Sequence, residues 1–192
     1  MYNSGMSDEF MDIGIPSQIT ISKGFQQLKI TRKWFDVKYI YIIPFVLIWN
    51  AFLFYWYKMA LSYPNIDWLA LLFPILHVSM GIGLTYYVLT GLFNKTVIDV
   101  NFNSFNVRHS PFPYSGNKTL ASKTLIQLYC KREDFWSRFH GSSSFTVHAI
   151  TSRRENIKLL SGLENAEQAL FIEQEIEKFL HIEDKLVKGE VR

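Results

Sequence analysis

Residues 39–57 read YIYIIPFVLIWNAFLFYWY, and residues 68–94 read WLALLFPILHVSMGIGLTYYVLTGLFN. The first run has 19 residues without a charged side chain, and the second has 27. A hydrocarbon core of ~30 Å needs about 20 apolar residues of α-helix to cross it. The two runs therefore predict a membrane protein with a helical hairpin in residues 34–94, whose spans cover about 37–58 and 68–93.

The composition of the remaining chain is that of an ordinary soluble domain. The average of 48% hydrophobic residues over 192 residues combines the apolar hairpin with a more polar part after residue 95. About 100 residues are enough for a core of their own. The net charge of +3 comes without a long basic run, so nucleic acid is not an expected partner. The single cysteine, Cys130, excludes an internal disulfide and a multi-cysteine metal site.

Positive charges predict the orientation of the hairpin. The connection at 58–67 carries one lysine and one aspartate, whereas basic residues are frequent before the first run. They are Lys23, Lys29, Arg32, Lys33 and Lys38. Lysine and arginine favour the cytoplasmic side, so both termini are expected in the cytoplasm. The start of the chain lacks a basic segment followed by an apolar one, so we expect the first span itself to be the targeting signal.

Aromatic residues gather at both ends of the spans, where membrane proteins carry interfacial belts. The expected inner belt comprises Trp34, Tyr39 and Tyr41. The expected outer belt comprises Tyr55, Trp56, Tyr57, Tyr63 and Trp68.

A β-hairpin is predicted before the spans, in residues 17–33, after a flexible tail at 1–16. Hydrophobic residues alternate with polar ones on both sides of the turn at Lys23-Gly24. A lone two-stranded hairpin is marginally stable in water. We therefore expect these strands to join the sheet formed after the membrane spans.

Residues 95–182 predict about five short strands followed by one helix, before a charged tail at 183–192. Asn101, Asn103 and Ser104 favour a turn, and Asn165 is the expected N-cap of the helix. An apolar stripe recurs at helical spacing through Ala169, Ile172, Ile176 and Phe179. The other faces are expected to expose Glu167, Glu173, Glu175, Glu177 and Lys178. Because an anionic leaflet repels glutamate, we expect this helix to pack on the strands and not on a membrane.

Two strands, about five more strands and a closing helix are the inventory of a pleckstrin-homology-like domain. The expected fold class is an α+β membrane protein with a two-helix transmembrane hairpin inserted into a pleckstrin-homology-like β-sandwich. The runs ITRKWF, LIWNAFLFYWY and KLLSGLENAEQALFIEQEIEKFL, among others, resemble an uncharacterised family of small bacterial membrane proteins. That family combines two transmembrane helices with a cytoplasmic domain of this kind. The resemblance covers residues 28–183; it implies a bacterial inner membrane location, and it carries over no enzymatic activity.

Asn50 and His77 are strongly polar residues inside the spans. Counted from the outer ends of their helices at 1.5 Å per residue, they lie ~12 and ~15 Å deep. This matched depth predicts a hydrogen bond between the two helices. The alternative is a functional histidine in a proton relay or a haem site.

Ser79, Gly81, Gly83 and Thr85 form a stretch of small residues on the second span. Small residues allow helix backbones to approach closely, so this face is expected to pack against the first span or another protein. Pro44 and Pro74 lie within the spans and predict kinks.

The segment after residue 130 combines basic and aromatic side chains. They are Lys131, Arg132, Phe135, Trp136, Arg138 and Phe139. Such a loop can bind anionic lipid headgroups, although Glu133 and Asp134 offset part of its charge. A solvated loop or a protein-contact loop is the alternative.

The sequence contains no recognisable catalytic or cofactor motif. The histidines are scattered singly, Cys130 is expected in the core, and HExxH, GxSxG, GxGxxG and P-loop patterns are absent. We therefore expect no enzyme, no cofactor and no small-molecule substrate. The expected function is a membrane-anchored adaptor or scaffold whose cytoplasmic domain binds a partner protein or lipid headgroups. The alternative is an accessory subunit of a larger integral-membrane complex for respiration, secretion or transport.

Overall fold

The computed structural model describes residues 14–64, 68–133 and 144–191. The chain divides into two units. Unit 1 comprises Met1–Thr31, Ile98–Val107 and Gly116–Arg192, and unit 2 comprises Arg32–Val97 and Arg108–Ser115. The boundary runs through three strands, so each unit is continuous in space but not in sequence.

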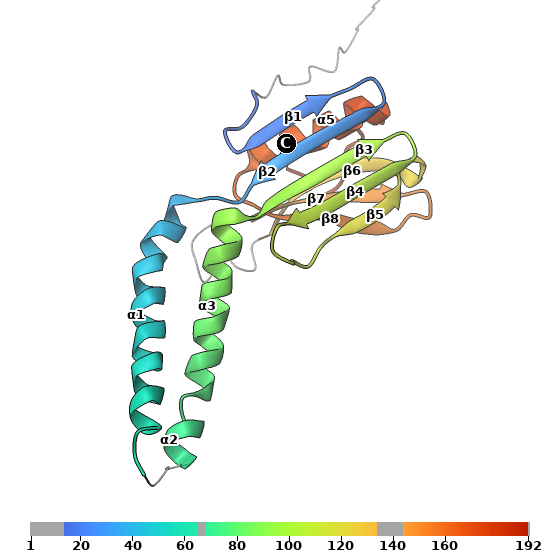
Figure 1. Cartoon of the computed structure of the whole chain (residues 1–192). Helices are drawn as coiled ribbons and strands as arrows, with labels where there is room; N and C mark the ends of the chain where they lie inside the picture. Colours follow the sequence, from blue (N-terminus) through green and yellow to red (C-terminus); the bar gives the residue numbers. More distant parts are fainter. Residues whose placement is uncertain (1–13, 65–67, 134–143, 192) are drawn as a thin grey trace, which may run out of the picture. The chain divides into compact units, whose positions relative to one another are not determined.

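Unit 2 contains the helical hairpin. Helix α1 covers Val37–Ala60, the short helix α2 covers Trp68–Leu72, and α3 covers Ile75–Phe93. Figure 1 shows α1 and α3 side by side along their length. Asp36 caps α1 because its extended backbone lets its side chain accept a hydrogen bond from the Lys38 amide at 2.8 Å. Both α1 and the segment Trp68–Phe93 are long and apolar enough to span a membrane, which confirms two long apolar helices.

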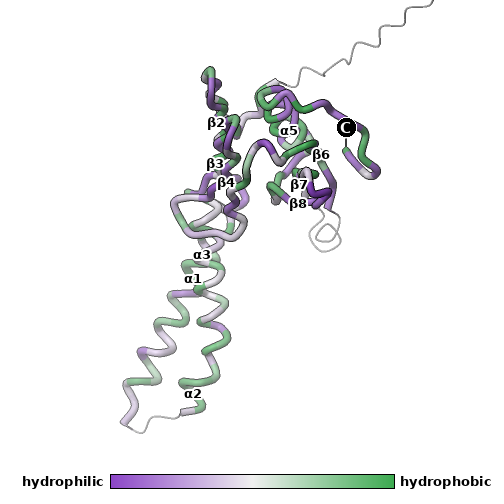
Figure 2. Tube along the Cα trace, turned by 90° about the vertical axis from the view of Figure 1, so that its right-hand side faces the viewer, coloured by the Kyte–Doolittle hydropathy of each residue, from purple (hydrophilic) through white to green (hydrophobic). Residues whose placement is uncertain are grey.

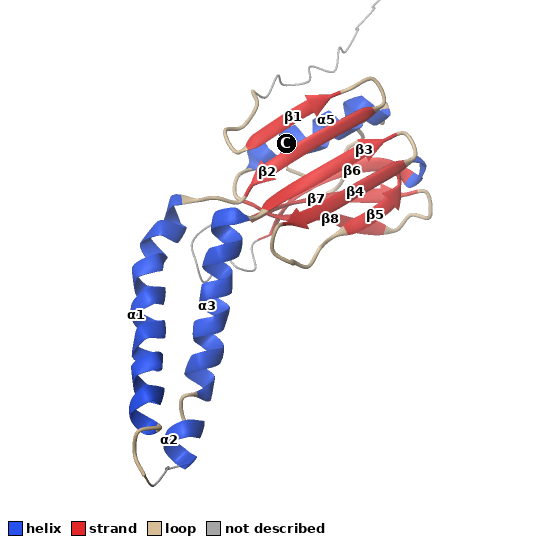
Figure 3. Cartoon of the chain, in the orientation of Figure 1, coloured by secondary structure: helices blue, strands red, loops and turns tan. Residues whose placement is uncertain are grey.

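A five-stranded antiparallel sheet unites strands from both sides of the hairpin in the sequence (Figure 3). Its order is β1-β2-β3-β4-β5. The strands are β1 Ile19–Lys23, β2 Gln27–Lys33, β3 Lys95–Asn101, β4 Ser104–Ser110 and β5 Lys118–Ala121. The β3–β4 turn forms where the sequence predicts it, because the Asn101 side chain accepts hydrogen bonds from the amides of Asn103 and Ser104 at 2.9 and 2.7 Å.

A second, three-stranded sheet has the order β6-β7-β8. The strands are β6 Leu125–Glu133, β7 Ser144–Thr151 and β8 Asn156–Leu163, and the short helix η1 at Ser122–Thr124 precedes them. The described residues thus form eight strands. The sequence predicts seven strands. The additional strand is β5, a short segment that pairs with β4 in a regular antiparallel register.

Helix α5, Ala166–Leu180, follows the strands and contacts β6, β7 and β8 (Figure 2). Asn165 accepts a hydrogen bond from the Gln168 amide at 3.0 Å, which confirms it as the N-cap. The predicted stripe also faces the core: Ala169, Ile172 and Ile176 are fully buried. Phe179 is partly buried and stacks on Phe102 with ring centroids 5.2 Å apart.

The core of unit 1 lies between the two sheets and α5. Its fully buried side chains come from each of these layers: Leu28, Ile30, Ile98 and Phe105 from the first sheet, Leu128, Cys130 and Val147 from the second, and Ile172 and Ile176 from α5. The alternating burial of β2 and β3 places every second residue in this core.

Candidate functional site

The two ends of the helical hairpin meet at its root. The Trp34 amide, just before α1, donates to the carbonyl of Asn94, just after α3, at 3.1 Å. Asn94 is also the C-cap of α3: its amide still donates to the Thr90 carbonyl at 2.9 Å, and its extended backbone, with ψ 151°, then ends the helix. The chain therefore enters and leaves the hairpin at the same end.

Asn94 fixes the loop that follows β4. Its side-chain oxygen accepts from the Phe112 amide at 2.8 Å, and its side-chain nitrogen donates to the Phe112 carbonyl at 3.1 Å. The Tyr86 hydroxyl of α3 donates to the carbonyl of Pro113. The side chain of Asn94 is buried, so this two-point contact satisfies polar groups that would otherwise be costly to bury.

An aromatic and polar group completes the root. Trp34 Nε1 donates to Thr96 Oγ1 at 2.7 Å, and Thr96 Oγ1 lies 3.0 Å from His109 Nδ1. The ring of Trp34 packs edge-on against His109 and Tyr114, with centroids 5.3 and 4.7 Å away. We call Trp34, Asn94, Thr96, His109 and Tyr114 the root cluster.

The surroundings of His109 favour its neutral form. The Thr96 hydroxyl, which accepts a hydrogen bond from Trp34, also lies within hydrogen-bond distance of His109 Nδ1. Burial, and then the positive charge of Arg32, lower the pKa of His109 below its usual 6.5.

Within the hairpin, the expected hydrogen bond between Asn50 and His77 is wrong. Asn50 Nδ2 donates to the Val46 carbonyl of its own helix at 2.8 Å and to Thr85 Oγ1 of α3 at 3.1 Å. Thr85 in turn donates to the Gly81 carbonyl at 2.7 Å. Asn50 thus joins the two helices as predicted, but through Thr85.

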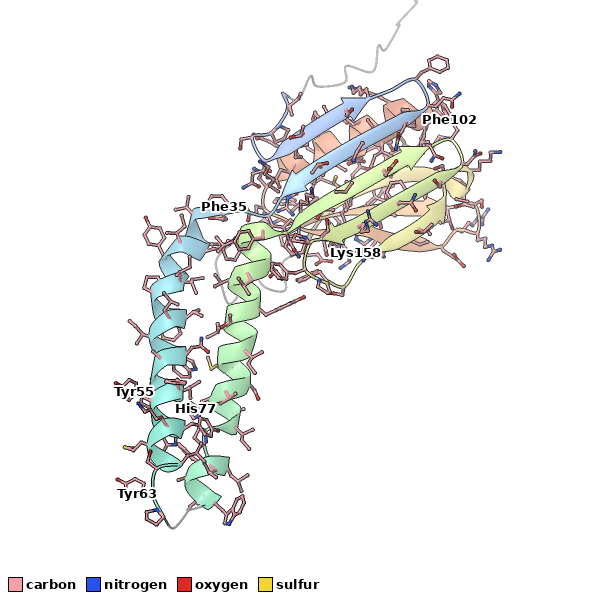
Figure 4. All side chains as sticks on the ribbon, viewed as in Figure 1. Phe35, Tyr55, Tyr63, His77, Phe102 and Lys158 are labelled. Carbon is pink, nitrogen blue, oxygen red and sulfur yellow. The ribbon has the colours of Figure 1, made fainter. Side chains whose placement is uncertain are left out.

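His77 packs among aromatic side chains between the helices (Figure 4). Trp49 Nε1 donates to its backbone carbonyl at 3.2 Å, and the Trp49 and His77 rings stack with centroids 5.8 Å apart. The Phe73 ring lies 5.6 Å from the imidazole. Within the described residues, the buried Nδ1 of His77 has no hydrogen-bond partner.

The residues of the predicted small-residue face lie on two different sides of α3. A Cβ on Gly81 would touch Asn50 and Trp49 of α1 at 3.2 Å, whereas one on Gly83 would meet nothing within 4 Å. Ser79 is exposed and donates to a carbonyl of its own helix. The tightest approach lies elsewhere: a Cβ on Gly91 would overlap the ring of Tyr39. The helices therefore pack through Gly81, Thr85 and Gly91.

Two residues of the expected outer belt donate hydrogen bonds at the break between α2 and α3. Pro74 has no amide hydrogen, so the Ala70 carbonyl four residues earlier lacks its helical donor. Trp56 Nε1 supplies one at 3.0 Å, and the Tyr57 hydroxyl donates to the Leu71 carbonyl at 3.1 Å. Neighbouring helices commonly satisfy carbonyls freed by proline in this way.

Other aromatic residues at the helix ends keep their rings exposed. These are Tyr41, Tyr55, Tyr63 and Trp68, and Figure 4 shows Tyr55 on the outward side of α1. By contrast, Tyr39 is buried against α3, with its ring 5.3 Å from that of Tyr87.

In unit 1, three glutamates of α5 contradict the expectation that they face solvent. Glu173, Glu175 and Glu177 are all buried. Glu177 Oε1 accepts from the Leu128 amide of β6 at 3.1 Å, and Glu175 pairs with Lys23 at 2.6 Å. Burial raises the pKa of Glu177 to about 8, although the Leu128 hydrogen bond opposes this shift.

Cys130 lies beside these glutamates in the core. It is fully buried, and its pKa is raised by burial and then by the charge of Glu173. The thiol is therefore protonated, which makes it a poor nucleophile. This placement agrees with the expectation that Cys130 is a core residue.

The predicted headgroup loop is described in part. Lys131 and Arg132 are exposed at the end of β6. Phe135, Trp136, Arg138 and Phe139 lie outside the described residues.

No family model matches the chain, and no curated protein matches it. Among residues 14–64, 68–133 and 144–191, no group of three or more His, Cys, Asp or Glu side chains is placed to hold a metal ion.

No motif in the sequence points directly to the root cluster. Trp34 was expected in the interfacial belt, and His109 was one of several scattered histidines. Asn94 follows the last apolar residue of α3, where asparagine is a common helix terminator. That position was the available signal, but it does not identify Phe112 as the partner.

Proposed function

We propose that the protein is a membrane-anchored, non-catalytic adaptor. Its helical hairpin spans a bacterial inner membrane, both termini lie in the cytoplasm, and the domain there binds a partner protein or lipid headgroups. The observation that carries the proposal is the exposure of the two apolar helices. In their most apolar stretches, 17% of α1 and 11% of Trp68–Phe93 are buried.

This exposure argues against a core helix of a soluble protein, which would be mostly buried. Ile48 and Phe54 of α1 are each 70% exposed, and Leu76 of α3 is 77% exposed. Hydrophobic residues recur along both helices (Figure 2). Soluble proteins rarely expose apolar surfaces of this extent, whereas lipid tails would cover them.

The sheet argues against a cleaved signal sequence. Strand β2 precedes the hairpin, β3 follows it, and the two are neighbours in one sheet. Removing the first helix with everything before it would take away β1 and β2. The backbone bond between Trp34 and Asn94 also supports a topology in which both ends of the hairpin lie on one side of the proposed membrane.

The architecture of unit 1 supports a pleckstrin-homology-like domain. Two antiparallel sheets share a core, and the C-terminal helix α5 packs on the second sheet. The extra strand β5 is a departure from the seven-stranded inventory, and it lies at the edge of the first sheet.

A non-catalytic role is supported by the use of reactive side chains in structural contacts. Cys130 is buried and protonated, and His109 is bonded to Thr96. His148 lies 2.9 Å from the Asn156 side chain and 3.1 Å from the Thr146 hydroxyl.

Alkaline carbonate washing of cell membranes tests the anchor. We expect the full chain to stay in the membrane pellet. A matched variant in which a short Gly-Ser linker replaces residues 36–93 should become soluble, because Trp34 and Asn94 are already adjacent. Release of the full chain by carbonate would contradict the proposal.

Gentle detergent extraction followed by native mass measurement tests the adaptor role. An adaptor gives the mass of this chain alone or as copies of itself. A stable, stoichiometric complex with unrelated membrane proteins would instead favour an accessory subunit.

A further inference from the structure

We propose that three cations at the root of the hairpin, Lys33, Lys95 and Arg108, form a binding site for the phosphates of anionic phospholipids. The inference rests on the proposed membrane anchor and names the lipid class that its cytoplasmic side recognises. It concerns a surface of the first sheet and not the segment after residue 130.

The three side chains share the outward face of the sheet. Lys33 and Lys95 alternate with the buried Arg32 and Thr96, and Arg108 follows the buried Val107. Alternate residues of a strand point to opposite faces, so all three point away from the core. A hydrogen bond on the same outward face, between the side chains of Gln27 and Asp99 at 2.8 Å, shows that outward residues of β2 and β3 meet there.

The site lies close to the proposed membrane surface. Lys95 is the second residue after α3, and a strand advances ~3.3 Å per residue, so its backbone is ~7 Å from the helix end. The headgroup layer on each side of a bilayer is roughly 5–8 Å thick. Lys33 is held near this depth by the bond between the adjacent Trp34 and Asn94. Arg108 precedes His109, which contacts Thr96.

No carboxylate within the described residues neutralises these cations. Lys33, Lys95 and Arg108 are exposed and make no ion pair there. Asp36 is the one acidic residue in the described part of unit 2, and it pairs with Lys38 at 3.0 Å. Farther along β3, Asp99 accepts hydrogen bonds from Gln27.

Unpaired cations in the headgroup layer favour lipids with a net negative charge. Each Lys or Arg near an anionic surface contributes about fivefold in affinity, so three contribute up to about a hundredfold if their effects add. Arginine can also bind phosphate with two parallel N–H groups, which a lysine cannot do. A preference of this size distinguishes phosphatidylglycerol from phosphatidylcholine.

The test uses the full chain in nanodiscs that contain a minority of phosphatidylglycerol in phosphatidylcholine. Lipids retained by the protein are identified by native mass spectrometry. We expect phosphatidylglycerol to be enriched over its share in the disc. The variant Lys33→Gln/Lys95→Gln/Arg108→Gln should lose about fivefold or more of this enrichment. Lys33→Arg/Lys95→Arg/Arg108→Lys should retain it, which separates charge from misfolding.

A matched control removes two lysines and one arginine from unit 1. Lys123→Gln/Arg153→Gln/Lys188→Gln has the same change in charge, and these exposed residues also make no ion pair within the described residues. It should keep the enrichment. Equal enrichment in the root variant and the wild type, or equal loss in the control, would overturn the site.

Further outcomes tell lipid phosphate from free phosphate, and failure of the membrane anchor from failure of the binding site. Inorganic phosphate that displaces phosphatidylglycerol, when chloride at the same ionic strength does not, would reassign the site to free phosphate. Failure of the chain to enter nanodiscs would contradict the membrane anchor itself. Entry without any lipid preference would contradict the binding site alone.

Discussion

Replacing Gly91 with alanine should destabilise the hairpin, whereas the same change at Gly83 should not. The Cβ added at position 91 would overlap the Tyr39 ring of α1. Overpacking of this kind typically costs about 1–3 kcal/mol. At Gly83 the added Cβ meets nothing within 4 Å, so alanine gains up to ~1 kcal/mol of helix propensity. Gly81 is intermediate, because its nearest contacts would be 3.2 Å away.

Reversible unfolding in mixed detergent–SDS micelles, followed by circular dichroism, measures this series. The expected order of stability is Gly83→Ala above Gly81→Ala above Gly91→Ala. Tyr39→Ala should relieve the overlap, so Gly91→Ala should cost less in that background than in the wild type. If Gly91→Ala is as stable as Gly83→Ala, or if the Tyr39 background makes no difference, the packing of α1 on α3 described above is wrong.

Three further substitutions test other contacts. Asn50→Leu and Thr85→Val should show a coupling of about 0.6–1.7 kcal/mol in a double-mutant cycle, whereas Asn50→Leu and His77→Leu should be additive. The reverse pattern would support a hydrogen bond between Asn50 and His77 instead. Trp56→Phe should cost about 1–3 kcal/mol because it leaves the Ala70 carbonyl without a donor, and Trp68→Phe, at an exposed tryptophan, is its control in the same SDS titration. Because the pKa of Glu177 rises to about 8 on folding, its contribution to stability should fall as the pH rises from about 4.5 to 8. Chemical unfolding of Glu177→Gln across this range should lack that fall. Identical pH profiles of the variant and the wild type would contradict the raised pKa.

The sequence predicts the parts of the fold that depend on local patterns. Unbroken apolar runs indicated both long helices, and period-3.6 spacing with Asn165 as N-cap indicated α5 from Ala166 to Leu180. These signals depend on residues that are neighbours along the chain. They need no knowledge of what each element packs against.

The polar partners could not be predicted in the same way. Depth along a helix does not say which side a residue faces, so matched depth paired Asn50 with His77 and missed Thr85. The same limit applies to α5, where glutamates outside the apolar stripe were assigned to solvent. Three of them are buried, and two contact strands that are distant in the sequence: Glu177 accepts from the Leu128 amide of β6, and Glu175 pairs with Lys23 of β1.

The root cluster depends on tertiary structure as a whole. Trp34, Thr96 and His109 lie in different segments, and the sheet brings them together only because β2 and β4 both flank β3. No local motif contains these contacts, since the residues are separated by the entire hairpin or by a strand turn.

The central claim, a membrane hairpin inserted between two strands of a cytoplasmic domain, is tested most directly by cysteine labelling. Single cysteines replace the exposed residues Ser17, Ser62 and Ser161 in a Cys130→Ser chain, and intact cells are treated with a membrane-impermeant thiol reagent. We expect labelling at position 62, between the helices, and protection at positions 17 and 161 until the cells are opened. Labelling of position 17 or 161 in intact cells, or protection of position 62 there, would contradict the topology.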